Sequence, residues 1–180
     1  MPSARHLFSS AAVLSLLVCG TAFSPEHSAA QQAQAPCSDD AYRQFDFWIG
    51  EWDVTTPQGQ PAGKNTIRSI LGGCVLYESW EGASGSNGHS HNIFDRAKGG
   101  WHQSWVDNSG LLLQLDGGLE DGKMVLRGET ASPSGTTRHR ITWSVEDDDG
   151  NVVRQFWESS TDGGTTWTVA FDGTYRKVRS

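Results

Sequence analysis

The spacing of turn signals most constrains what this chain can fold into. Clusters rich in glycine, asparagine, aspartate and proline recur between short runs of β-branched and aromatic residues. The clusters are TPQGQPAG, LGG, ASGSNG, DRAKGG, VDNSG, LDGGLEDG, ASPSG, EDDDGN and TDGG. They predict about ten short strands, and no segment between them is long enough for a crossover helix.

Alternation inside these strands predicts an apolar and a polar face. In KMVLRGE, Met124 and Leu126 share one face, and in RHRITWSV, His139, Ile141 and Trp143 share one face. An antiparallel meander with one apolar face removes its open edges by closing on itself. The expected fold class is therefore all-β, an antiparallel up-and-down barrel of about ten strands.

The first thirty residues differ from the rest of the chain. Arg5 and His6 precede the apolar run AAVLSLLVCGTAF, and the small residues of HSAA follow at the usual cleavage spacing. We predict a signal peptide over residues 1–30, an N-terminal leader over 31–44 and a single barrel domain over 45–180. The protein is then secreted or periplasmic. No later apolar run approaches the ~20 residues that a membrane-spanning helix needs.

The charge balance bears on the choice of partners. The formal net charge is -7 at pH 7, and only TTRHR and YRKVR are locally basic. Such a balance disfavours the phosphate backbone of nucleic acids. We therefore expect no nucleic-acid partner, and the pattern leaves the oligomeric state open.

Two cysteines remain after the predicted cleavage. Cys19 lies in the signal segment, whereas Cys37 and Cys74 belong to the mature chain. An even pair in an oxidising compartment predicts a disulfide that ties the leader to the third strand. The alternative is a buried Cys74 that acts as a small hydrophobic residue.

The stretch SSTDGGTTW contains the pattern S-x-D-x-G-x-T-W, which resembles the Asp-box of sialidase propeller blades. A propeller repeats its motif every ~40 to 50 residues, but this pattern occurs once. Turn chemistry accounts for its members: Asp162 accepts hydrogen bonds from its own turn, Gly164 takes positive φ and Trp167 anchors the outgoing strand. We expect a structural hairpin.

The segment FDFWIGEWDV places Trp52 in a G-x-W pattern after a short aromatic run. This resembles the opening of calycin barrels, the superfamily of lipocalins and fatty-acid-binding proteins. With GGCVLYESWEG, WHQSWVD, VRQFWESSTDGGTTW and YRK, it resembles a family of exported bacterial domains of unknown function placed near the lipocalins. The resemblance implies that Trp52 closes one barrel end and stacks with a basic residue of the last strand, here Arg176. It implies no reaction.

The candidate binding residues are those that the alternation aims at the lumen. In CVLYESW and WHQSWVD, carboxylate and amide groups share a face with indoles. The expected ligand-binding residues are Glu78, Trp80, Trp101, Gln103, Trp105, Trp143 and Arg154. A buried carboxylate needs a partner, and Arg154 is available to Glu78. The alternation leaves open whether Arg154 or Gln155 faces inward.

Three functions fit this pattern. The first is binding of a small apolar or aromatic molecule in the barrel lumen. The second is an isomerase, cyclase or lyase in which Glu78 is the general base and His139 its partner. The third is an extracellular interaction module, which a fully packed lumen would favour. The chain has no G-x-S-x-G, H-E-x-x-H or P-loop motif.

Histidines raise the question of metal and haem. His89 and His91 share a strand face, but no third ligand stands at a fixed spacing, so we expect no metal site. Nitrobindins, a ten-stranded branch of the calycins, hold haem through one histidine. By that resemblance His139 is a candidate axial ligand and His102 a weaker one. We expect no cofactor, with haem as the alternative.

Overall fold

Alternating runs punctuated by turn residues produce an all-β chain. The computed structural model describes Met1 and residues 35–178. Two short 3-10 turns, η1 (Asp40–Arg43) and η2 (Asp46–Trp48), precede the first strand, and a third, η3 (Leu71–Gly73), follows the second. The strands are β1 (Gly50–Thr55), β2 (Pro61–Ile70), β3 (Val75–Gly82), β4 (Asn87–Asp95), β5 (Gly100–Asp107), β6 (Leu112–Glu120), β7 (Lys123–Ser132), β8 (Gly135–Val145), β9 (Val152–Ser160) and β10 (Thr168–Lys177).

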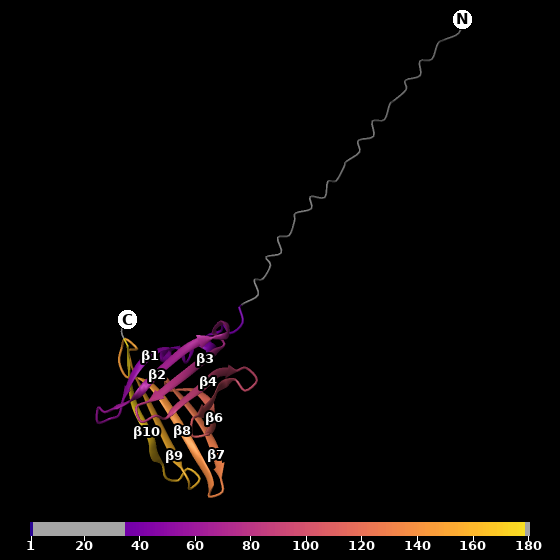
Figure 1. Ribbon diagram of the computed structural model, residues 1–180. Helices are drawn as coiled ribbons and strands as arrows, with labels where there is room; N and C mark the ends of the chain where they lie inside the picture. Colours follow the sequence, from indigo (N-terminus) through magenta and orange to yellow (C-terminus); the bar gives the residue numbers. More distant parts are fainter. Residues whose placement is uncertain (2–34, 179–180) are drawn as a thin grey trace. The chain divides into compact units, whose positions relative to one another are not determined.

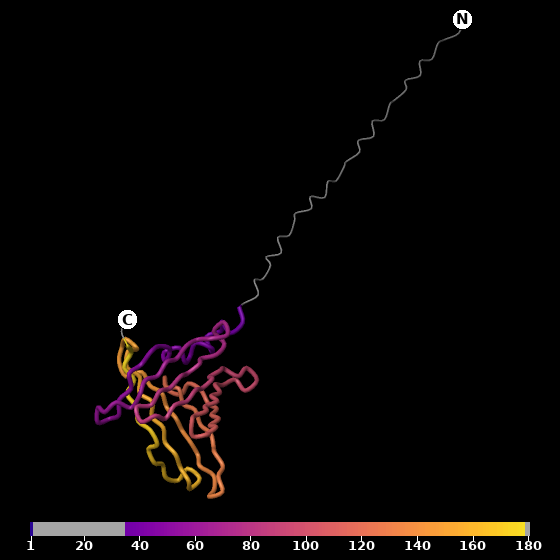
Figure 2. Tube along the Cα trace, viewed as in Figure 1, coloured from indigo at the N-terminus to yellow at the C-terminus, as the bar shows by residue number. Residues whose placement is uncertain are grey.

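These strands form a closed barrel with an up-and-down order. Each strand pairs antiparallel with the next along the chain, and β1 pairs antiparallel with β10 to close the sheet (Figure 1). Figure 2 shows the same path as a trace that runs back and forth between the two barrel ends. The predicted fold class is confirmed, and closure leaves no unpaired sheet edge among the described strands.

The register places the predicted apolar residues inside. Met124 lies opposite Trp143, and Leu126 lies opposite Ile141. These side chains are at most 3% exposed. Because side chains alternate across a strand, the neighbouring Lys123, Arg127 and Arg140 face outward, as the pattern predicted.

Aromatic rings fill one end of the barrel. Phe45, which precedes η2, and Trp48, the last residue of η2, stack with centroids 5.0 Å apart. Trp101 and Trp143 meet the Phe45 ring edge-on at 5.6 and 5.2 Å. Trp52 holds the segment in place, since its Nε1 donates a 2.9 Å hydrogen bond to the Trp48 carbonyl. This end is therefore closed by the residues that immediately precede β1.

The cation expected over Trp52 is a different residue. Lys177 Nζ lies 5.3 Å from the centre of the Trp52 ring, and the two residues face each other across β1 and β10. Arg176 is exposed and lies opposite Asp53. The assignment of Arg176 is wrong by one position, because a one-residue step on a strand moves a side chain to the other face.

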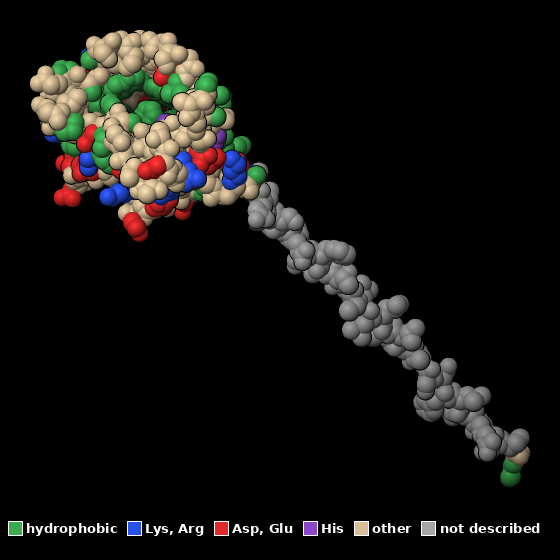
Figure 3. All heavy atoms as spheres, turned by 90° about the horizontal axis from the view of Figure 1, so that it is seen from below, with side chains coloured by type: hydrophobic (Ala, Val, Ile, Leu, Met, Phe, Trp, Pro, Cys, Tyr) green, Lys and Arg blue, Asp and Glu red, His purple; other side chains and the backbone are tan. Residues whose placement is uncertain are grey.

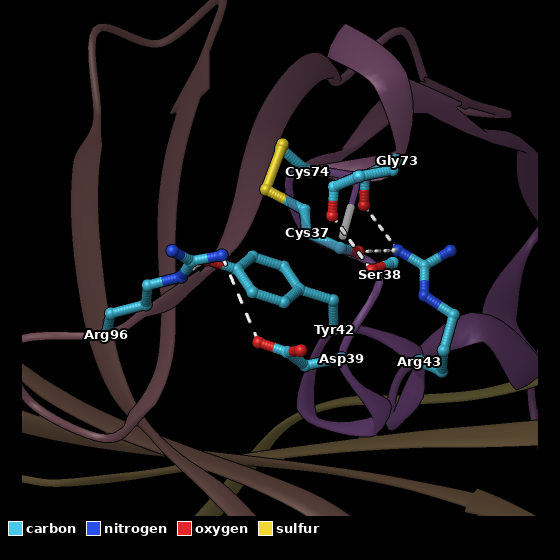
Figure 4. The surroundings of a disulfide bond; sticks show 9 residues. Cys37, Ser38, Asp39, Tyr42, Arg43, Gly73, Cys74 and Arg96 are labelled. Carbon is cyan, nitrogen blue, oxygen red and sulfur yellow. Dashed lines mark hydrogen bonds and ion pairs between the residues drawn. A yellow bond between two sulfur atoms is a disulfide. The ribbon is translucent and has the colours of Figure 1, made fainter. Parts of the chain in front are cut away.

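The predicted disulfide joins Cys37 to Cys74 (Figure 4). Beside it, Arg43 donates hydrogen bonds to the carbonyls of Gly73 and Cys37. Arg43 also forms an ion pair with Asp46 at 3.2 Å. The bridge and the arginine together tie the segment before β1 to the β2–β3 connection.

Tyr42 anchors the same segment to the β4–β5 connection. Its side chain is buried, and its hydroxyl accepts a 2.9 Å hydrogen bond from Arg96 Nε. Residues 35–44, the described part of the predicted leader, thus belong to the same compact unit as the barrel. The predicted signal peptide lies outside the described residues, Met1 excepted. Among the described residues, no helix has the length and hydropathy to cross a membrane.

The β9–β10 connection forms the hydrogen-bonded turn that the sequence predicted. Asp162 accepts bonds from the amides of Thr165 and Thr166 at 3.0 and 2.9 Å. The Trp167 indole donates to the carbonyl of Gly164, which has φ of +91°. The Thr166 hydroxyl also donates to Asp162, and this bond contributes most to holding the pKa of Asp162 well below its usual range.

Candidate functional site

A pocket of about 310 Å³ opens at the barrel end opposite η1 and η2. We call it the lumen pocket. It is lined by Ala62, Glu78, Trp80, Ser84, Ser86, Trp105, Asp107, Gln155, Trp157, Ala170, Phe171 and Tyr175. Figure 3 looks at the barrel from below the view of Figure 1 and shows a hollow bordered largely by hydrophobic side chains. One end of the lumen is thus filled and the other is open.

The aromatic walls of the pocket lie close against neighbouring backbone. Three of the rings cross an inward glycine, where a methyl group would come within 2.3 to 2.7 Å of the ring. The pairs are Trp80 with Gly63, Trp105 with Gly88 and Phe171 with Gly173. Because glycine has no side chain, a ring can lie along the wall instead of projecting across the lumen. The space that remains is the pocket.

Glu78 of β3 lies at the inner part of the pocket and is 4% exposed. Asn65 Nδ2 of β2 donates a 2.7 Å hydrogen bond to its Oε1, and Ser90 Oγ of β4 donates a 2.6 Å bond to its Oε2. Burial raises the pKa of Glu78 to about 7, against a smaller lowering by these two bonds. The carboxyl is therefore close to half-ionised near neutral pH.

A chain of amides fixes the direction of the Ser90 hydroxyl. Asn92 Nδ2 donates to Ser90 Oγ at 2.9 Å, and Gln103 Nε2 of β5 donates to Asn92 Oδ1 at 2.8 Å. Since Ser90 accepts from Asn92, its own proton is free to point at Glu78. Gln103 also lines a smaller cavity of about 50 Å³, which shares Glu78 and Trp105 with the lumen pocket.

Tyr175 and Gln155 form the opposite side. The Tyr175 hydroxyl donates to Gln155 Oε1, so this proton is directed away from Glu78. Burial, followed by the nearby charge of Glu78, raises the pKa of Tyr175. Gln155 Nε2 has no hydrogen-bond partner among the described residues, which leaves its two N–H donors available at the pocket surface.

The pocket lining is acidic. Asp107 lies in the lining at the end of β5 and accepts hydrogen bonds from the Ser109 amide at 2.9 Å and the Leu111 amide at 3.2 Å. Burial raises the pKa of Asp107, but the bonds from Ser109, Leu111 and Trp105 outweigh it and the net pKa is lowered. No lysine, arginine or histidine stands among the lining residues of the described chain.

The structure brings together only part of the predicted site. Glu78, Trp80 and Trp105 line the lumen pocket, and Gln103 lines the adjoining cavity. Trp101 and Trp143 do not line either space; they are 2% and 0% exposed within the aromatic cluster at the closed end. The alternation placed them inward correctly but could not show which end of the lumen the η2 segment would fill.

Arg154 lies on the outer face, and its expected pairing with Glu78 is wrong. Its guanidinium makes two 2.8 Å hydrogen bonds to Asp172 and lies over the Phe156 ring. The inward residues of β9 are Val153, Gln155 and Trp157. In the part of the chain that the structure describes, the partners of Glu78 are therefore neutral.

His139 has both ring nitrogens engaged. Its Nδ1 accepts a 3.2 Å hydrogen bond from the Trp157 indole, so Nε2 carries the proton and donates to Thr130 Oγ1 at 2.8 Å. Burial lowers the pKa of His139, which favours this neutral form. His139 does not pair with Glu78, and it does not fit the part of a haem ligand because no ring nitrogen has a free lone pair.

The three other histidines of the described residues, His89, His91 and His102, lie outside the lumen. His89 hydrogen-bonds the Tyr77 hydroxyl at 2.9 Å, and the Tyr77 ring also contacts His91. His102 bonds Asp116 and Ser104 at 2.9 and 3.0 Å. No group of three or more histidine, cysteine, aspartate or glutamate side chains suited to a metal occurs within residues 35–178.

Sequence reasoning missed several polar residues of the site. They are Asn65, Ser90, Asn92 and Tyr175, whereas the alternation left Gln155 open as the inward alternative to Arg154. A usable signal was present in HSHNIF. If His89 and His91 share the outer face, then Ser90 and Asn92, which alternate with them, face inward. The same alternation applies to GTYRKV, where Tyr175 faces inward if Arg176 faces outward.

Comparisons with known proteins leave the family open. No family model matches the chain, and no curated protein matches it either. The closed ten-stranded antiparallel barrel is compatible with a calycin-like or lipocalin-like fold. The argument for function therefore depends on the lumen pocket itself.

Proposed function

We propose that this protein is an exported, lipocalin-like barrel that binds a small apolar or aromatic molecule in the lumen pocket. The single observation that carries this proposal is a half-open pocket of about 310 Å³ with aromatic walls and one buried carboxylate. Ligand pockets are typically apolar concavities with a few placed polar groups, and this pocket has that form.

Export is supported by the disulfide and by the sequence of the first thirty residues. A bridge such as Cys37–Cys74 persists in oxidising compartments and is rare in the cytosol. We therefore place the protein outside the cytoplasm, secreted or periplasmic. Relationship to the calycins is supported by the barrel and by Trp52, which anchors the closed end.

The test uses the intrinsic fluorescence of the pocket tryptophans. 4-Nitrobenzyl alcohol, whose nitro group quenches indole emission, is expected to give saturable quenching because three tryptophans line the pocket. Trp105→Phe should reduce the quenched fraction. The control is Trp167→Phe, since that indole belongs to the β9–β10 turn and not to the pocket lining. Quenching that is linear, unsaturable and equal in both variants would contradict the proposal.

The catalytic alternative has one observation in its favour. Glu78 lines the pocket with a pKa raised to about 7 by burial, which suits a general base that removes a proton from carbon and returns it. Deuterium uptake by 2-tetralone in D₂O that requires Glu78 would favour an isomerase or lyase. Binding without such exchange favours a carrier or receptor.

A further inference from the structure

The charges in the lumen restrict the kind of ligand that fits. Glu78 and Asp107 are the ionisable carboxyls of the pocket, and the described lining includes no basic side chain. An anionic ligand would meet two like charges in a partly desolvated space and would find no counter-charge. Fatty acids and other carboxylates are therefore poor candidates for this pocket.

Glu78 itself lacks a counter-charge. Asn65 and Ser90 each donate one hydrogen bond, and the Tyr175 proton is directed to Gln155. Each carboxylate oxygen accepts one bond from the described residues and can accept another. Burying an ionised carboxylate without an opposite charge is costly, so a cation brought by the ligand would offset an existing penalty.

The walls are suited to a cation as well. Trp80, Trp105, Trp157 and Phe171 surround the space beside Glu78, and all four are half-buried. The rings of Trp80, Trp105 and Phe171 lie along glycines and therefore lie close to the barrel wall. Aromatic faces attract ammonium groups through the ring quadrupole, and several faces around one carboxylate form an aromatic cage.

We propose that the lumen pocket binds a small organic amine, with its ammonium group against Glu78 and its apolar part between Trp80, Trp105 and Phe171. This proposal rests on the lumen pocket being the binding site. Asp107 in the lining adds a second negative charge that attracts a cation during entry. Burial raises the pKa of Glu78, and no basic side chain of the described lining lowers it, which agrees with this assignment.

The experiment compares three ligands of one shape that differ in charge. Binding of 2-phenylethylamine, 2-phenylethanol and phenylacetate to the wild-type protein is measured by isothermal titration calorimetry at pH 8, where the amine is protonated. We expect the amine to bind about 10- to 100-fold more tightly than the alcohol, the scale of a charge-assisted hydrogen bond. Phenylacetate should bind most weakly.

Glu78→Gln keeps the shape and removes the charge, so it should bring the amine to within about threefold of the alcohol. The control is Glu81→Gln, because Glu81 lies on the same strand but is exposed. That variant should retain the preference for the amine.

The outcomes separate this inference from the function on which it rests. If the alcohol binds as tightly as the amine in wild type, or phenylacetate binds best, the amine assignment is wrong and the pocket remains a binding site. If none of the three ligands nor 4-nitrobenzyl alcohol binds, both proposals fail. A preference for the amine that survives Glu78→Gln would also overturn the assignment, since the charge at Glu78 would not be its source.

Discussion

At the residue scale, Glu78 is a carboxylate buried without an opposite charge among the described residues that surround it. On the outer face, Arg154 pairs with Asp172 and Arg140 pairs with Glu158. Glu78 lies inside the barrel, and its hydrogen-bond donors are a neutral amide and a neutral hydroxyl group. A buried carboxylate held in this way is destabilised in its ionised form, and groups perturbed in this way are concentrated at functional sites.

The pH dependence of stability tests the state of Glu78. Because burial raises its pKa from 4.5 to about 7, the folded protein binds more protons than the unfolded chain between these values. The contribution of Glu78 to stability is therefore full below pH 4.5, falls as pH rises to 7 and is constant above. The loss amounts to about 3 kcal/mol. Glu78→Gln should remove this loss, so denaturation in urea at pH 5 and pH 8 should show a flatter profile than wild type.

The control for this prediction is again Glu81→Gln, which should keep the wild-type difference between the two pH values. Other carboxyls contribute equally to both proteins and cancel in the comparison. Parallel profiles for wild type and Glu78→Gln would mean that Glu78 titrates alike in the folded and unfolded chain. The description of a charge without a counter-charge would then be wrong.

At the scale of the strands, glycines at three inward positions give room to aromatic rings that border the lumen pocket. At the closed end the inward positions carry large side chains such as Trp143, whereas at the open end glycines alternate with the aromatic residues of neighbouring strands. A methyl group at Gly173 would lie 2.6 Å from the Phe171 ring and 3.0 Å from Val54. Both contacts are with side chains, so the ring can move and the backbone need not.

Gly173→Ala should therefore push Phe171 into the lumen pocket. We expect a loss of about 3- to 10-fold in affinity for 4-nitrobenzyl alcohol, since overpacking by one methyl costs about 1 kcal/mol or more. The matched control is Gly118→Ala on β6, where a methyl group meets nothing within 4 Å. Fluorescence titration of both variants measures their affinities for 4-nitrobenzyl alcohol. Equal affinities would mean that Phe171 does not border the bound molecule.

The same scale shows how much of the molecule the sequence predicts. Turn residues and alternation predicted the strands and the inward position of Met124, Leu126 and Ile141, because both signals are local. The phase of β9 was not decided, since Arg154 and Phe156 alternate with Gln155 and Trp157 and both faces are amphipathic. The pairing of β9 with β8 and β10 resolves it, because Trp157 lies opposite the inward Ile141 and Gln155 lies opposite the inward Trp143. That register is a property of the assembled strands and cannot be read from β9 alone.

At the scale of the whole molecule, the two ends of the barrel have different roles. The closed end combines the disulfide, the Arg43 hydrogen bonds and the aromatic cluster around Phe45. The open end has the lumen pocket and the β9–β10 turn. The tryptophans of the two ends were indistinguishable by alternation, which explains why Trp101 and Trp143 were assigned to the ligand. Whether an inward ring meets ligand or other rings depends on its height in the barrel.

This separation predicts that stability and binding respond independently to the disulfide. The Cys37–Cys74 bridge has a sequence separation of 37 residues. Replacing both cysteines in Cys37→Ser/Cys74→Ser should lower the free energy of unfolding by about 3 to 4 kcal/mol, because the unfolded chain regains the entropy of the opened loop. Affinity for 4-nitrobenzyl alcohol should change less than about twofold, since distant sites act additively. Urea denaturation and fluorescence titration of the same preparation measure both quantities.

Reduced wild-type protein is the matched control and should behave like the variant, because it loses the same bridge without any substitution. A parallel loss of affinity, under conditions where the variant is still folded, would show that the closed end shapes the pocket and that the two ends are not independent.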